Sequence, residues 1–370
     1  MKEQLVQVID KKDLQVLILT DGYNIHHLSG YRGHTGMLVA FQVEQYILTD
    51  SRYTEQVELE APEFTCVDIG REGYSKTIAG MLQKAFAKEG RSTLRIGFEN
   101  KEISYMQYQA LVDTFAKELT GMQVEFVPLE DAVNVYREVK TEDEIAKLAR
   151  AEQIGDEAFT EIVKFIHENW KDGLTEQRVA LQLEYEMRLR GAEGTSFDTI
   201  AASGSNSSLP HAMPQPKLLT EGDFLTMDFG CMYQGYCSDM TRTIHIGEVV
   251  ESEQKKVYDT VLQAQLAALS VVKPGMVCSD VDKCARDIIA DAGYGDYFGH
   301  GLGHSVGLFI HEEPRFSMKC DAVLKPGVVI TVEPGIYLPG RFGVRIEDMI
   351  VVTEDGYQNL ASSPKELICV

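Results

Sequence analysis

Apolar and polar positions in the first third of the chain alternate in a pattern that predicts a small α/β domain. Three apolar runs predict strands, and the second is long enough to form a hairpin: 14–20, 37–50 and 96–100. Apolar residues at helical spacing predict one helix over 75–90, ending at Gly90, and another over 103–119. Strands that alternate with helices indicate a mixed sheet with helical cover.

The pattern changes near residue 132, where longer amphipathic segments begin. Helical spacing predicts a helix over 141–170, and Thr141 and Glu144 have the spacing of a capping box. A second helix is expected to begin after the cap Thr175 and to end before Gly191. We therefore expect an N-terminal domain over 1–132 and a C-terminal domain over 133–370.

The C-terminal part contains an internal echo. The segment LLTEGDFLTMDFG (218–230) aligns with VLKPGVVITVEPG (323–335) at an offset of 105 residues, and helices are predicted between the copies at 252–272 and 279–292. In each copy a turn glycine opens an apolar strand, and Asp228 falls opposite Glu333. The echo favours two related halves that face each other across a shared site. Chance similarity of two buried strands is the alternative.

Each copy delivers one carboxylate at a strand end and a second one after a turn. Asp228 is followed by Asp239, and Glu333 by Glu347. Four acids in one cavity would repel each other without cations, and carboxylates suit divalent metals such as Mn²⁺ and can bridge two of them. The alternative is that each acid is a turn or ion-pair residue, with Arg345 pairing Glu347.

Histidines gather in a glycine-rich segment, GHGLGHSVGLFIHEEP (299–314), which contains His300, His304 and His311, and His211 lies in a polar loop. Neutral imidazole suits a metal that also carries carboxylates. The spacing of His300 and His304 also fits a helical zinc pair. However, the glycines oppose a helix there and no HEXXH motif is present. Structural histidines are the alternative, and a dinuclear metal hydrolase is the interpretation favoured by the residues together.

Composition narrows the class of protein. Of 370 residues, 44% are hydrophobic and 25% charged, which is typical of a globular protein. A formal net charge of -22 opposes a broad nucleic-acid interface, and no apolar run is long enough to span a membrane. The first residues do not resemble a signal peptide, and the seven cysteines form no CxxC pair. We therefore expect free thiols and a cytoplasmic protein.

Five blocks together resemble the metallopeptidases that include aminopeptidase P, prolidase and methionine aminopeptidase. These blocks are MDFG, SDMTRT, GHGLGHSVGL with HEEP, TVEPGIY and VRIED. The segment NIHHLSGYRGHTGMLVAF also resembles the N-terminal domain of the prolidase, aminopeptidase P and creatinase branch. The resemblance implies an α/β (α+β) protein, with a small mixed-sheet domain before a "pita-bread" domain of two pseudo-symmetric halves.

The resemblance also implies a set of site residues. The implied metal ligands are Asp228, Asp239, His304, Glu333 and Glu347. Asp239 and Glu347 would bridge two divalent ions, with Mn²⁺ expected and Co²⁺ or Zn²⁺ as alternatives. Asp228 would complete the coordination of one ion, and His304 and Glu333 that of the other.

The remaining implied residues act on the substrate. Glu333 would carry the proton from water to the leaving amine, while His311 and His211 would donate hydrogen bonds to the reacting amide. The residues expected near substrate are His300, His211, His311, Tyr337 and Arg345. Of these, Tyr337 and Arg345 match the residues that brace the ligand carboxylates.

The implied activity is that of an Xaa-Pro aminopeptidase, with small peptides that carry proline at the second position as substrates. An Xaa-Pro dipeptidase is the alternative, and it needs a cation for the substrate's C-terminal carboxylate. The cations between His311 and Glu333 are Arg315, Lys319 and Lys325, whose placement the sequence leaves open.

Other relatives fit less well. Creatinase lacks the full ligand set, and methionine aminopeptidase lacks this kind of N-terminal domain. A non-catalytic peptide- or protein-binding module is the reading from another class. We expect a homodimer without nucleic-acid or membrane partners.

Overall fold

The computed structural model describes residues 2–86, 92–248 and 250–370. The chain forms two compact units, Met1–Arg137 and Glu138–Val370. The sequence-based boundary after residue 132 stays a prediction. Within the described ranges, no helix combines the length and the apolar character that crossing a membrane would require.

The N-terminal unit is built on a six-stranded sheet in the order β4-β3-β2-β1-β5-β6. Its strands are β1 (Val16–Leu19), β2 (Met37–Ala40), β3 (Gln45–Thr49), β4 (Thr65–Asp68), β5 (Thr93–Phe98) and β6 (Gln123–Pro128). β2 pairs antiparallel with β1 and β3, whereas β5 pairs parallel with β1 and β6. The predicted mixed sheet and its hairpin are confirmed, and β4 and β6 are additional strands.

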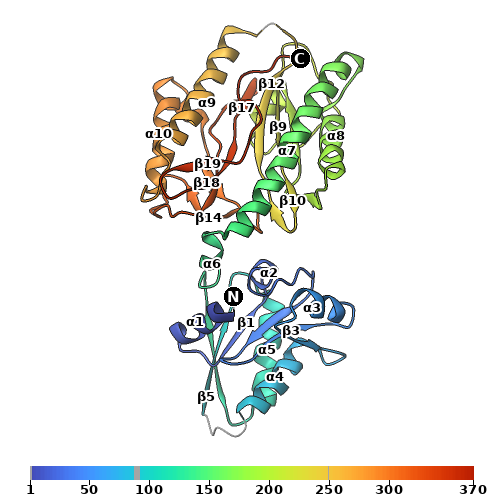
Figure 1. Cartoon of the computed structure of the whole chain (residues 1–370), viewed down its shortest axis with the longest axis vertical. Helices are drawn as coiled ribbons and strands as arrows, with labels where there is room; N and C mark the ends of the chain where they lie inside the picture. Colours follow the sequence, from blue (N-terminus) through green and yellow to red (C-terminus); the bar gives the residue numbers. More distant parts are fainter. Residues whose placement is uncertain (1, 87–91, 249) are drawn as a thin grey trace. The chain divides into compact units, whose positions relative to one another are not determined.

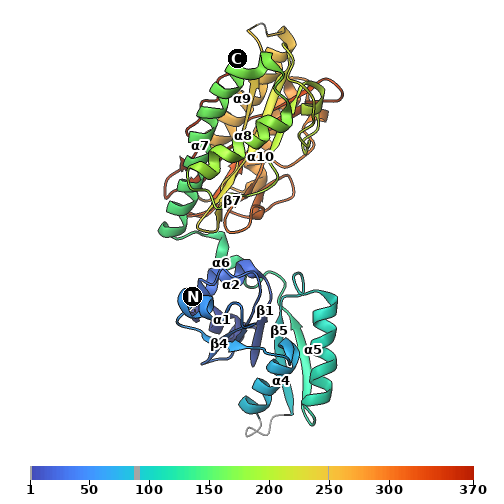
Figure 2. The same ribbon diagram turned by 90° about the vertical axis from the view of Figure 1, so that its right-hand side faces the viewer.

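Helices cover both faces of this sheet (Figure 2). They are α1 (Lys2–Lys12), α2 (Gly22–Ser29), α3 (Thr54–Glu60), α4 (Gly73–Phe86) and α5 (Tyr105–Glu118). Alternation along β1 explains this arrangement. Leu17 and Leu19 pack in the core with α1, α2 and α3, whereas Val16 and Ile18 pack in the core with α4 and α5. The predicted helix end at Gly90 lies outside the described residues.

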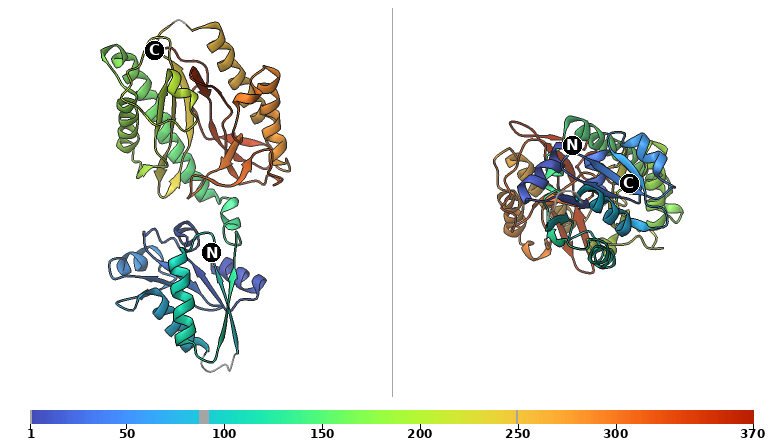
Figure 3. Two further views of the ribbon diagram at one scale, coloured as in Figure 1. Left: turned by 180° about the vertical axis from the view of Figure 1, so that it is seen from behind. Right: turned by 90° about the horizontal axis from the view of Figure 1, so that it is seen from below.

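The C-terminal unit carries two pairs of helices on opposite sides of its strands (Figures 1 and 3). One pair is α7 (Glu142–Asn169) and α8 (Glu176–Leu189), and the other is α9 (Ser252–Val271) and α10 (Cys278–Asp291). The predicted capping box of α7 is confirmed, because Thr141 accepts a hydrogen bond from the backbone N–H of Glu144 while the Glu144 side chain bonds back. Thr175 caps α8 as predicted. The short helices of this unit are η1 (Trp170–Asp172), η2 (Gly204–Ser208) and η3 (Gly295–Tyr297), and α6 (Val135–Glu138) contains the boundary between the two units.

The strands of this unit form several small antiparallel sheets. One has the order β12-β9-β8, with β8 (Ile200–Ser203), β9 (Phe224–Phe229) and β12 (Met240–His245). Another has the order β14-β13-β15-β18-β19, with β13 (Gly303–Ser305), β14 (Glu312–Phe316), β15 (Val329–Val332), β18 (Asp348–Val352) and β19 (Tyr357–Asn359). The others contain β7 (Gly194–Thr195), β10 (Cys231–Tyr233) and β11 (Tyr236–Cys237), and the pair β16 (Gly335–Leu338) and β17 (Phe342–Arg345).

The internal echo corresponds to two structural halves. β9 pairs with β12 in the first half, and β15 pairs with β18 in the second, each pair antiparallel. The matched glycines Gly222 and Gly327 both adopt the left-handed backbone, with φ of 92° and 86°. Each half has its own apolar core, one beneath α7 and α8 and the other beneath α9 and α10. We therefore expect the acids at the ends of the β9–β12 and β15–β18 pairs to lie close together.

Candidate metal centre

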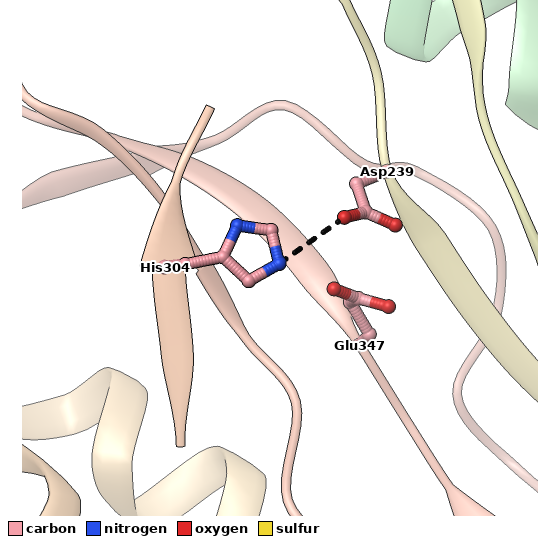
Figure 4. A group of neighbouring side chains, drawn as sticks. All are labelled: Asp239, His304 and Glu347. Carbon is pink, nitrogen blue, oxygen red and sulfur yellow. Dashed lines mark ion pairs between the residues drawn. The ribbon is translucent and has the colours of Figure 1, made fainter. Parts of the chain in front are cut away.

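Three side chains of the C-terminal unit point toward one another (Figure 4). Asp239, His304 and Glu347 each offer one ligand atom, and these atoms lie within 4.8 Å of one another. The Nε2 atom of His304 is 3.5 Å from Asp239 Oδ2 and also 3.5 Å from Glu333 Oε1. These spacings leave room for a cation between the groups.

Strand register explains why residues so distant in sequence meet. Asp239 directly precedes β12 and Glu347 directly precedes β18, while Asp228 lies in β9 and Glu333 directly follows β15. The two halves are joined where the backbone N–H of Glu347 donates to the carbonyl of Thr241 over 3.1 Å. The hairpin geometry expected from the sequence therefore places all four acids around one cavity.

Arg345 connects one of these acids to an aromatic residue and a histidine. Its Nη2 donates to Asp228 Oδ2 over 2.5 Å, and its Nη1 donates to the Tyr337 hydroxyl over 2.8 Å. That hydroxyl lies 2.9 Å from His300 Nε2. The simple ion pair of Arg345 with Glu347 is therefore not the arrangement found, because β17 directs the guanidinium at β9.

Two threonines that the sequence analysis did not single out hold ligand carboxylates. Thr241 Oγ1 donates to Glu347 Oε2 over 2.6 Å and accepts from Arg345 Nε over 2.9 Å. Thr331 Oγ1 donates to Glu333 Oε1 over 3.3 Å and accepts from the backbone N–H of His304 over 3.1 Å. Thr331 lies two residues from the acid that it holds, whereas Thr241 lies 106 positions from Glu347, so spacing along the chain does not reveal that contact.

The acids of the cluster carry a strong electrostatic cost. Burial, with repulsion from Glu347 and Asp228, raises the pKa of Asp239 well above its usual range. Burial, with repulsion from Glu333 and Asp228, does the same to the pKa of Glu347. Removal from water raises the pKa of Glu333 to about 8, although Arg345 opposes the shift. A nearby cation would relieve all three shifts.

The histidines shift in the opposite direction. Burial lowers the pKa of His304 to about 3 and that of His300 to about 4, and it also lowers the pKa of His311. These imidazoles are therefore neutral near neutral pH. The backbone carbonyl of Ser305 lies 3.2 Å from His304 Nδ1 and so favours a proton on that nitrogen. The lone pair of Nε2 is then free to face the acids.

The residues present fit a divalent cation. Among the described residues, the buried Oδ1 of Asp228 has no hydrogen-bond partner, although its Oδ2 is held by Arg345. An acceptor-only carboxylate oxygen that is buried and unpaired is costly, and a cation satisfies it. Four carboxylates with one neutral imidazole form a donor set suited to Mn²⁺ and related ions.

A cavity of about 690 Å³ opens at this cluster. All five expected metal ligands line it, together with His211, His300, His311 and Arg345. Tyr337 is expected near substrate but does not belong to the lining, and it reaches the site through its hydrogen bonds. Arg315 and apolar residues complete the wall, the latter including Phe197, Ile200 and Met213.

Comparison with known proteins identifies the fold. Residues 146–354 match the profile of Metallopeptidase family M24, and residues 2–139 match that of the Creatinase/Prolidase N-terminal domain. The chain belongs to metallopeptidase family M24. The predicted pita-bread domain preceded by a creatinase/prolidase-like domain is thereby confirmed, as is the prediction of a metal-dependent hydrolase.

Relatives and solved structures match almost the whole of this chain. It is 37% identical to the "Xaa-Pro dipeptidase" of Pyrococcus furiosus, over 99% of each chain. A solved "Xaa-Pro dipeptidase from Bacillus anthracis" is 38% identical with a TM-score of 0.89, covering 100% of this chain and 99% of that one. The solved "X-Pro aminopeptidase" of Thermotoga maritima is 35% identical with a TM-score of 0.86, covering 98% and 100%.

Proposed function

We propose that this M24 metallopeptidase hydrolyses Xaa-Pro dipeptides. The similarity to proteins named Xaa-Pro dipeptidase in Pyrococcus furiosus and Bacillus anthracis supports the alternative of the sequence analysis over its main reading, the aminopeptidase. Similarity to the Thermotoga maritima protein keeps the aminopeptidase as the competing activity. Both cleave the bond on the amine side of proline, and they differ in whether chain follows the proline.

The placement of Arg315 is the observation that favours a dipeptide. Arg315 lines the metal cavity, and its side chain is 47% exposed with Glu313 as an ion-pair partner. Lys325 instead pairs with Glu138 and does not belong to the cavity wall. A dipeptide ends in a carboxylate next to the scissile bond, and a guanidinium there matches it in charge and hydrogen-bonding geometry.

We assign the metal ligands as the resemblance implies. Asp239 and Glu347 would be shared by two divalent ions, with Asp228 completing one site and His304 and Glu333 the other. Mn²⁺ is the proposed ion, with Co²⁺ or Zn²⁺ as alternatives. When bound, such ions lower the pKa of a coordinated water and polarise the scissile carbonyl. The unpaired Oδ1 of Asp228 and the neutral His304 support this assignment.

The other residues bind, orient and move protons. Glu333 is held at one oxygen by Thr331, which fixes its carboxylate for transfer of a proton toward the leaving amine. His311 packs against His304, with ring centroids 4.5 Å apart, and would donate to the developing oxyanion. His211 also lines the cavity and would donate to the reacting amide. The chain from Arg345 through Tyr337 to His300 fixes the direction of the His300 ring.

The role of Arg315 gives a direct test of this function. Glu313→Gln and Arg315→Gln are compared on an Xaa-Pro dipeptide and on the same dipeptide with a C-terminal amide. We expect Arg315→Gln to raise the KM for the free acid by about tenfold or more, the loss of one charged hydrogen bond, and to change the amide little. Equal effects on both substrates would contradict carboxylate recognition by Arg315.

We further propose a cytoplasmic homodimer. All seven cysteines are free, which supports a reducing compartment. The dimer rests on the family resemblance. Light scattering of the metal-loaded chain tests it, and a monomeric, fully active enzyme would contradict it.

A further inference from the structure

The segment 204–215 forms one wall of the metal cavity. It begins with the helical turn η2, and five consecutive residues of it, from Pro210 to Pro214, line the cavity. Its outer part is open to solvent, with Leu209 58% exposed and Met213 70% exposed. A surface segment of this kind needs specific hydrogen bonds if His211 is to keep a fixed position.

Several of these bonds converge on one carboxylate, while others come from the second half, where Arg345 Nη1 donates to the carbonyl of Pro210 over 3.3 Å. Glu176 is the first residue of α8, and its side chain is fully buried. Oε1 accepts from the backbone N–H and hydroxyl of Ser203, at 2.6 and 2.8 Å. Oε2 accepts from Asn206 Nδ2 and from the backbone N–H of Gln215, both at 2.8 Å. Oε1 therefore holds Ser203, the residue before the segment, and Oε2 holds both Asn206 near its start and Gln215 at its end.

A further bond carries this constraint across the segment. Asn206 Nδ2, which donates to Glu176, also lies 3.2 Å from the carbonyl of Met213, two residues after His211. Nearby, Lys217 Nζ donates to the carbonyl of Ser203 and to Asp223 Oδ2, each over 2.8 Å. These hydrogen bonds together fix the distance between the parts of the segment that precede and follow His211.

We propose that Glu176 is a positioning residue that holds His211 at the metal cavity by clamping both ends of the segment 204–215. The inference rests on the proposed function in one respect, namely that His211 contacts the peptide. Glu176 itself touches neither peptide nor metal ligand and acts only through the segment. A carboxylate is required because all four partners are donors.

The variant Glu176→Gln tests this requirement at constant size. In either orientation its amide nitrogen faces N–H or O–H donors, so either the two bonds to Ser203 or those to Asn206 and Gln215 are lost. Glu144→Gln is the matched control, since Glu144 is also buried in the first turn of a helix, where it accepts from Thr141 and Tyr236. Both variants are made in the full-length, Mn²⁺-loaded protein.

The first readout is independent of activity. Amide hydrogen exchange in 204–215 should accelerate by about tenfold or more in Glu176→Gln, while 298–304 and the bound metal content stay at wild-type values. Glu144→Gln should leave exchange in 204–215 unchanged. Wild-type exchange in Glu176→Gln, or loss of metal from it, would overturn the proposal.

The second readout is a double-mutant cycle with His211→Ala on the Xaa-Pro dipeptide. Glu176→Gln should lower kcat/KM by about tenfold in the wild-type background but by less than about twofold in the His211→Ala background, because the two changes remove one effect. Losses that multiply would overturn the proposal. If the wild-type protein cleaves no Xaa-Pro peptide, the proposed function fails, whereas the exchange result still decides the role of Glu176.

Discussion

The guanidinium of Arg345 donates to Asp228 over 2.5 Å and joins the two halves of the C-terminal unit at the metal centre. Arg345 ends β17 in the second half, and Asp228 lies in β9 of the first. The contact holds one oxygen of Asp228 and leaves its buried Oδ1 without a partner among the described residues. Arg345 therefore fixes the orientation of the Asp228 carboxylate, so that Oδ2 faces the guanidinium and Oδ1 faces away from it.

This contact predicts that Arg345→Lys weakens metal binding without removing a ligand. Lysine keeps the charge but cannot bond Asp228, Tyr337 and Thr241 at once. We expect Mn²⁺ affinity to fall by about 10–100-fold, the usual effect of losing a partner that orients a ligand. Calorimetric titration measures this. The control Arg341→Lys alters an exposed pair with Glu253 and should bind Mn²⁺ as the wild type does. Equal affinity in both variants would contradict the role of Arg345.

A second prediction separates metal ligands from residues that contact substrate. Asp239→Ala should lose paired metal binding as well as turnover, because the proposed shared carboxylate is gone. The metal-free fold should be little affected, since one of several repelling acids is removed. His311→Ala should keep its metal while kcat falls by about 10²–10³, the typical loss of one transition-state donor.

Metal content by mass spectrometry and steady-state kinetics, measured on both variants in parallel, check this assignment. Retention of both ions in Asp239→Ala, combined with loss of metal from His311→Ala, would reverse the proposed roles. The Gly/His segment would then supply His311 as a ligand.

A third prediction concerns the stability of the metal-free protein. The raised pKa of Glu333, about 8, means that the folded protein keeps a proton that the unfolded chain releases at lower pH. The raised pKa values of Asp239 and Glu347 act in the same direction. Stability from these groups is therefore present at low pH and is lost as the pH rises through the folded pKa.

The lowered pKa values of His300 and His304 act oppositely, but only below their ordinary value of 6.5. We therefore expect the Tm of metal-free protein to fall between about pH 6.5 and 8, and that of Mn²⁺-loaded protein to change less. Differential scanning calorimetry with and without EDTA measures the difference. Glu333→Gln should flatten the slope, and a slope identical to the wild type would refute the contribution of Glu333.

The features that show as a repeat or a period along the chain were predicted from the sequence. The echo placed Asp228 opposite Glu333, and the matched backbone of Gly222 and Gly327 confirms that the copies fold alike. Helical periodicity and the capping box at Thr141 likewise predicted α7. These features are local, so spacing along the chain was sufficient to find them.

Two sets of contacts between residues distant in the chain were not predicted. Thr241 bonds Glu347 across 106 positions, and Glu176 bonds segment ends up to 39 positions away. A threonine in a strand and a glutamate at a helix start are common in any fold, so neither carries a signal by itself. The ion-pair alternative considered only Glu347, the near neighbour of Arg345 in sequence, whereas its guanidinium bonds Asp228, 117 positions away.

The most direct test of the account is hydrolysis of an Xaa-Pro dipeptide and the corresponding Xaa-Pro-Yaa tripeptide by one Mn²⁺-loaded preparation, with and without excess EDTA. We predict that the dipeptide is cleaved with the higher kcat/KM and that EDTA abolishes activity on both. Preference for the tripeptide would contradict the dipeptidase assignment in favour of the aminopeptidase. Full activity in EDTA, or no cleavage of either peptide by folded, metal-loaded protein, would contradict the metal-dependent Xaa-Pro peptidase itself.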